Sequence, residues 1–93
     1  MSAPAHRIPR LTAEFYRSRL LHAPPGSTED WPIRRAIAEL TGRAPLPETT
    51  DELQFRTPIG SVYARRVIGT SLVLLYRVEA PFVDILVVKP AAW

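Results

Sequence analysis

The sequence predicts an α+β fold, in which an N-terminal helical hairpin packs on an antiparallel four-stranded sheet. Two observations lead to this fold class. Apolar residues follow helical spacing in the first half of the chain, and they follow strand spacing from residue 53 onward. Prolines and glycines stand between these segments and mark the turns. Because 93 residues are too few for two independent cores, we expect residues 1–93 to form a single domain.

A flexible tail is expected at residues 1–10, followed by a first helix at residues 12–23. Thr12 is a suitable N-cap, because its hydroxyl can accept a hydrogen bond from a free helical N–H group. The stretch Pro24-Pro25-Gly26 cannot continue a helix and therefore ends it. Helical spacing predicts one apolar face made of Phe15, Tyr16, Leu20 and Leu21.

A second helix is expected at residues 31–41, antiparallel to the first because the connection is short. Acidic residues precede Trp31, which suits the positive end of a helix, and Gly42 is a natural ending. Trp31 itself is expected in the core or as a helix cap. The spacing i, i+3, i+4, i+7 predicts a buried stripe made of Ile33, Ala36, Ile37 and Leu40.

Beyond a polar loop, four strands are expected, at residues 53–57, 61–68, 71–79 and 82–89. Pro58-Ile59-Gly60 and Gly69-Thr70 supply the first two turns, so that neighbouring strands run antiparallel. The stretch from Leu72 to Tyr76 is apolar throughout, which predicts a central strand that is covered on both faces.

Composition narrows the classes of protein and of site. The longest apolar run is too short to cross a membrane, and the N-terminal residues lack the apolar segment of a secretory signal, so we expect a cytoplasmic protein without a membrane partner. There is no cysteine, and the two histidines and scattered acids lack the spacing of metal ligands. We therefore expect neither a metal nor a cofactor.

The positive charge is carried almost entirely by arginine, with Lys89 as the exception among 12 basic residues. Residues 53–78 contain Arg56, Arg65, Arg66 and Arg77 but no acid. Because arginine suits phosphate and carboxylate, this segment indicates an anionic partner. Scattered solubilising charge on an open sheet face is the alternative.

These arginines lead to a binding-site prediction. Strand alternation separates Arg65 from Arg66, so at least one of them faces away from the helices, where Arg56 and Arg77 could join it. We expect Arg65, Arg66 and Arg77 to contribute to one surface for an anionic partner. The candidate binding residues are Arg56, Tyr63, Arg65, Arg66, Arg77 and Trp93. Trp93 is expected either to fold back on the sheet or to anchor a partner.

The stretches "IRRAIAELTGRAPLP", "LQF" and "GSVYARRVIGTSLVLLYRVEAPFVDILVVK" resemble the RelE/ParE-type toxins of bacterial toxin–antitoxin pairs, over about residues 31–89. The resemblance implies a helical hairpin before a sheet, with Arg66 in the place of the family's strand arginine and Tyr63 as its preceding aromatic. Tyr76-Arg77-Val78 matches the end of the central strand. The resemblance also implies a first strand at "HRIPRL", where Pro9 suits a strand poorly.

One branch of that family cleaves messenger RNA in the ribosome, and a second branch poisons DNA gyrase without that chemistry. The resemblance therefore implies as partners an antitoxin-like or target protein, the ribosome with its mRNA, or DNA gyrase. In this chain Pro90 and Ala91 stand where the ribonuclease branch often has polar residues.

Whether the chain is an enzyme stays open at this point. RNA cleavage needs a base, an acid and cations for the phosphate, and arginine supplies only the cations. The candidate catalytic residues are Lys89, Tyr76 and Arg66. The structural alternatives are a solvated edge-strand cation for Lys89 and a core aromatic for Tyr76.

Two functions from different classes are compatible with these observations. The first is a RelE/ParE-like toxin component that acts on translation or DNA topology by binding more than by efficient RNA cleavage. The second is a non-enzymatic binding module, for example a phage or mobile-element inhibitor that docks on a nucleic-acid-handling enzyme.

Overall fold

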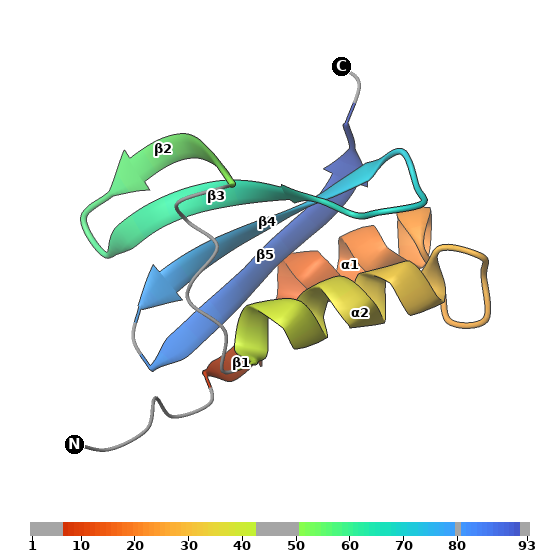
Figure 1. Ribbon diagram of the computed structural model, residues 1–93, viewed down its shortest axis with the longest axis horizontal. Coiled ribbons are helices and arrows are strands. Elements are labelled where there is room, and N and C mark those ends of the chain that lie inside the picture. Colours follow the sequence, from red (N-terminus) through yellow and green to blue (C-terminus); the bar gives the residue numbers. More distant parts are fainter. Residues whose placement is uncertain (1–6, 43–50, 80, 92–93) are drawn as a thin grey trace.

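The computed structural model describes residues 7–42, 51–79 and 81–91 and has an α+β fold with two helices and five strands (Figure 1). The elements in chain order are β1 (Ile8–Leu11), α1 (Ala13–His22), α2 (Asp30–Thr41), β2 (Glu52–Thr57), β3 (Gly60–Arg66), β4 (Leu72–Glu79) and β5 (Phe82–Pro90). No helix within these ranges is long and apolar enough to cross a membrane.

The sheet is mixed and has the strand order β1-β5-β4-β3-β2. The four strands β2 to β5 form the predicted antiparallel meander, and β4 lies at its centre. The predicted four-stranded antiparallel sheet is incomplete, because β1 pairs with β5 in parallel and adds a fifth strand. The α+β class is confirmed, and the strand number and direction are corrected.

Residues 8–11 form strand β1, where the sequence analysis placed the end of a flexible tail. The Ile8 N–H donates to the Pro81 carbonyl at 2.8 Å, and the Thr12 N–H donates to the Ile85 carbonyl at 3.2 Å. Pro9 is tolerated between them because β1 is the edge of the sheet, where a missing N–H group interrupts no second ladder. Hydrogen bonds to β5 thus override the poor intrinsic strand propensity of proline.

Both helices cover one face of the sheet (Figure 1). Thr12 is the N-cap of α1 as predicted, and its hydroxyl oxygen accepts a hydrogen bond from the Phe15 N–H at 3.1 Å. Arg7 donates to the carbonyls of Leu40 and Gly42, which supplies partners for the C-terminal end of α2.

The predicted stripe of α2 faces the core, because Ile33, Ala36 and Leu40 are buried and Ile37 is partly buried. The predicted face of α1 is wrong in all but one position. Phe15 is buried, whereas its other apolar residues are exposed: Tyr16, Leu20 and Leu21. Trp31 is also exposed rather than part of the core.

The side of α1 that faces the sheet carries Ser18, whereas the expected Leu20 and Leu21 are exposed. The Ser18 hydroxyl accepts a hydrogen bond from the Val88 N–H at 3.1 Å and so ties α1 to β5. The remaining core comes from the sheet residues that face the helices, among them Val67, Leu72, Leu74, Tyr76, Val83, Ile85 and Val88.

Two irregularities bend the sheet. The register of β2 against β3 shifts between Leu53 and Phe55, and the register of β4 against β5 shifts between Leu75 and Tyr76. Such bulges increase the local twist of a strand. In Figure 1 the β2 ribbon curves strongly at the edge of the sheet opposite β1.

Candidate functional site: a polar pocket on the open face of the sheet

The two neighbouring arginines of β3 lie on opposite faces of the sheet. Arg65 pairs across the ladder with Leu74, whose side chain belongs to the core under the helices. Arg66 pairs with Val73 and therefore lies on the other face. We call it the open face because neither helix covers it, although Val73 and Leu75 on this face are buried. The two arginines cannot contribute to one surface, because successive side chains of a strand alternate between faces.

Arg65 is already paired with acids on the helical side. Its guanidinium donates to Asp51 at 3.3 Å and to Glu39 of α2 at 3.1 Å. Asp51 also accepts a hydrogen bond from the Tyr76 hydroxyl at 2.7 Å. The ring of Tyr63 stacks on that of Tyr76, with centroids 5.7 Å apart. Arg65, Tyr63 and Tyr76 thus form a structural cluster that joins β3 and β4 to Asp51, just before β2, and to Glu39 of α2.

Arg77 lies on the open face but is also neutralised. It donates two hydrogen bonds to Asp84 on β5, at 3.2 and 2.7 Å. Arg10 of β1 binds the other side of the same carboxylate, lies 3.6 Å from Glu79 and stacks over the Phe82 ring. This arrangement joins β1, β5 and β4.

The pKa of the Asp84 carboxyl group depends on its burial and on its two arginine partners. Burial disfavours its charged form and is the largest single influence, but the hydrogen bonds from Arg10 and Arg77 together outweigh it. The pKa of Asp84 is therefore lowered from its ordinary value. The carboxylate stays charged at neutral pH and holds both arginines.

The predicted common surface of Arg65, Arg66 and Arg77 is therefore not formed. Acids from distant parts of the chain, Glu39, Asp51 and Asp84, neutralise two of the three arginines. Arg56 is exposed on β2 and pairs across the ladder with Ser61, which places it on the face of Tyr63 and Arg65 and not on the open face. Trp93 lies outside the described residues.

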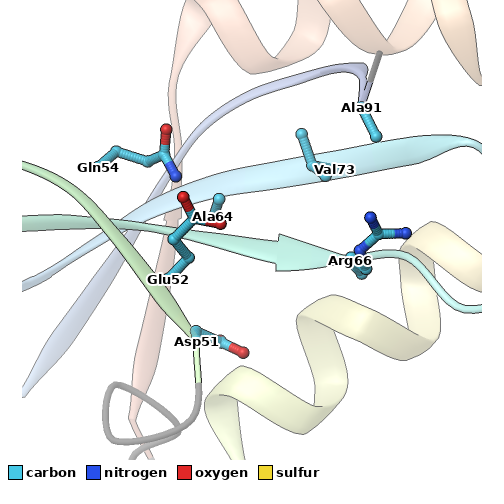
Figure 2. Close-up of a pocket in the computed structure, with 7 residues that line it drawn as sticks. All are labelled: Asp51, Glu52, Gln54, Ala64, Arg66, Val73 and Ala91. Atoms are coloured by element: carbon cyan, nitrogen blue, oxygen red, sulfur yellow. The ribbon is translucent and has the colours of Figure 1, made fainter.

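The open face contains a pocket of about 360 Å³ beside Arg66 (Figure 2). Its floor is Ala64 of β3 and Val73 of β4, and Arg66 stands at the end of β3. Its lining residues are Asp51, Glu52, Gln54, Ala64, Arg66, Val73 and Ala91. Glu52 and Gln54 are two residues apart on β2 and both line the pocket, beside the bulge between Leu53 and Phe55.

Three polar side chains of this pocket have no side-chain partner among the described residues. Within the described residues, Glu52, Gln54 and Arg66 make no side-chain hydrogen bond or ion pair. Glu52 pairs with Ala64 in the ladder, which makes it a diagonal neighbour of Arg66 at a typical separation of about 7 to 8 Å. A carboxylate, an amide and a guanidinium thus surround a small apolar floor.

The candidate catalytic residues divide between the two faces. Tyr76 is fully buried and hydrogen-bonded to Asp51, so it cannot contact a substrate. Lys89 pairs with Val73 across the ladder, which places it on the open face two strands from Arg66, at roughly 10 Å. Lys89 does not line the pocket, which leaves Arg66 as the one residue of the three in its wall.

This pocket can bind an anionic group, because the Arg66 guanidinium can donate two hydrogen bonds to a phosphate or carboxylate. Gln54 can donate or accept beside it, and Glu52 can accept a proton. Sequence reasoning missed Glu52 and Gln54. Glu52 stands one residue before the acid-free span, and only the pairing of β2 with β3 brings it toward Arg66.

In the part of the chain that the structure describes, no group of three or more histidines and acids could hold a metal ion. Comparison with protein-family models, with curated proteins and with solved structures finds no match.

Proposed function

We propose that the chain is a RelE/ParE-like toxin component, which acts in the cytoplasm on translation or DNA topology by binding a phosphate-bearing target. The observation that carries this proposal is Arg66, uncommitted in the open-face pocket between Glu52 and Ala91. It is the arginine that the resemblance matches to the family's strand arginine, and it is the one of the three predicted arginines without an acid partner among the described residues.

The order of the elements also supports the proposal. The resemblance implies a first strand at the N-terminal end of the chain, ahead of the helical hairpin. Strand β1 occupies residues 8–11 and is followed directly by α1 and α2. This agreement concerns the arrangement of elements and leaves the activity to experiment.

Action by binding is favoured over efficient cleavage because the pocket offers few groups for proton transfer. Glu52 is a candidate base, but among the described residues no histidine, tyrosine or lysine lines the pocket to protonate the leaving oxygen. Tyr76, the tyrosine that was expected near the chemistry, is buried on the other side of the sheet.

The proposal is tested by inducible expression in a bacterial host, following growth, protein synthesis and plasmid supercoiling together. We expect growth arrest with either a loss of protein synthesis without mRNA cleavage or a change in supercoiling. Normal growth at high expression of the folded protein would contradict the toxin proposal. Ribosome-dependent mRNA cleavage would contradict action by binding and would direct attention to Glu52.

A non-enzymatic binding module is the second candidate function. It is favoured by the internal neutralisation of Arg77, which leaves the open face less basic than a nucleic-acid interface requires. Normal growth together with specific binding of one nucleic-acid-handling enzyme would support this candidate.

A further inference from the structure

A second surface, which shares only Arg66 with the lining of the open-face pocket, combines one exposed tryptophan with several arginines. Trp31 and Ile68 are 71% and 83% exposed, although both are large apolar side chains. Helical spacing places Trp31, Arg35 and Ala38 on the side of α2 opposite its buried stripe. We call this the Trp31–Ile68 surface, made of Trp31, Arg34, Arg35, Ala38, Arg66 and Ile68.

Two adjoining hollows define its shape. The first has a volume of about 400 Å³ and is lined by Trp31, Arg34, Arg35 and Ala38. The second, of about 120 Å³, lies between α2 and the end of β3, where Arg35 and Glu39 meet Arg66 and Ile68. Because Arg35 lines both, the two hollows form one continuous surface.

The two hollows are lined by three arginines and one acid, Glu39, so their net charge is positive. Arg34 and Arg35 contact Asp30 and Glu39 through one nitrogen each, at 3.2 and 3.9 Å, and their side chains remain 60% and 72% exposed. The two acids are shared with other arginines, since Arg19 binds Asp30 and Arg65 binds Glu39. The outer ends of both guanidinium groups therefore remain available to a further carboxylate.

From these observations we infer that the Trp31–Ile68 surface binds an acidic peptide segment of another protein, with a bulky apolar side chain packed against Trp31. Tryptophan and arginine are the residues that most often dominate binding at protein interfaces. The positive charge selects carboxylates, and the apolar lining selects an aliphatic or aromatic anchor between them. A nucleic acid fits less well, because Trp31 is the one aromatic residue of this surface and single-stranded binding uses several stacking residues.

This inference does not depend on the function proposed above. Arg66 belongs to both sites, so the test uses Trp31 and Arg35, which do not line the open-face pocket. Both side chains are exposed, and neither substitution removes a core contact. Loss of peptide binding and loss of toxicity can therefore be observed separately.

The test is selection of random displayed peptides on the full-length protein. The selected peptides are then synthesised and titrated against wild type and purified variants. We expect enrichment of acid-rich peptides with one bulky apolar residue. We expect Trp31→Ala and Arg35→Ala each to weaken their binding by about tenfold, while Arg17→Ala on α1 leaves it within about twofold. Circular dichroism melting confirms that each variant is folded.

Three results would overturn the inference. The first is the absence of enriched peptides, or enrichment of peptides without an excess of acids. The second is equal binding of the selected peptides to wild type, Trp31→Ala and Arg35→Ala. The third is binding of oligouridine RNA that Trp31→Ala abolishes while no acidic peptide is enriched, which would assign the surface to nucleic acid.

Discussion

Asp84 is the one buried charged side chain among the described residues, and it holds two arginines from neighbouring strands. A carboxylate in this position stabilises the fold only as long as both arginines donate to it, since its burial alone is unfavourable. Because Arg10 belongs to β1 and Arg77 to β4, Asp84 fixes the edge strand to the meander. The sequence offers no signal for this pairing, which joins residues 74 and 7 positions apart.

We expect Asp84→Ala to lower the free energy of unfolding by about 1 to 3 kcal/mol, because it leaves the partly buried Arg77 without its acceptor. Urea unfolding of the purified variant measures this change. Glu14→Ala is the matched control, since its pair with Arg17 is exposed on both sides and is worth little. An Asp84→Ala variant as stable as the control would show that β1 docks without this carboxylate.

Acid should destabilise the protein through the same residue and through Asp30. The pKa of Asp30 is lowered, first by the hydrogen bond from Arg19 and then by that from the Gly26 N–H. For both acids the folded pKa lies below the unfolded value of about 3.9, so the unfolded chain binds more protons as the pH falls. Their stabilisation is complete above the unfolded pKa and is lost as the pH falls through the folded pKa.

The measurement is a series of urea unfolding curves from neutral pH down to about pH 2. We expect the unfolding midpoint to fall in the acidic part of the series and Asp84→Asn to reduce this pH dependence. A midpoint that stays constant to the lowest pH would contradict the assignment of both carboxylates as charged in the folded protein.

At the level of elements, the two helices show what hydrophobic spacing can predict. In α2 the stripe of Ile33, Ala36 and Leu40 is the only apolar face that the helix could bury, and it is the one buried. In α1 the apolar residues lie around much of the helix, so their spacing does not select a face. The hydrogen bond of Ser18 with Val88 and the packing of Phe15 determine which side of α1 faces the sheet. Both contacts form only when the sheet is folded.

The turn between β2 and β3 gives a prediction for one glycine. Gly60 has φ of +137°, and a Cβ there would lie 2.9 Å from the Val78 carbonyl oxygen of β4. We expect Gly60→Ala to cost about 1 to 3 kcal/mol of unfolding free energy, from backbone strain and this contact. Gly69→Ala is the control, because its φ of +85° is also positive but its Cβ would meet no atom within 4 Å. Thermal unfolding compares the two, and equal losses would contradict a role for the close approach to β4.

Over the whole molecule, tertiary pairing decides which charges remain available to a partner. The sequence predicts the α+β class and the antiparallel meander, because apolar spacing and turn residues are local. It also predicts that Arg65 and Arg66 lie on opposite faces of the sheet, but it does not say which of them faces away from the helices. It cannot predict that Asp51, Glu39 and Asp84 neutralise Arg65 and Arg77, since these contacts depend on strand register and helix placement.

The proposed function depends on contact between Arg66 in the open-face pocket and a target. The most direct test is the growth of bacteria that express wild type, Arg66→Ala or Arg56→Ala at equal levels of folded protein. Arg56 is the matched control, an exposed arginine on β2 that does not line the pocket. We predict growth arrest with wild type and Arg56→Ala and its loss with Arg66→Ala. Arrest that persists in Arg66→Ala would contradict this contact.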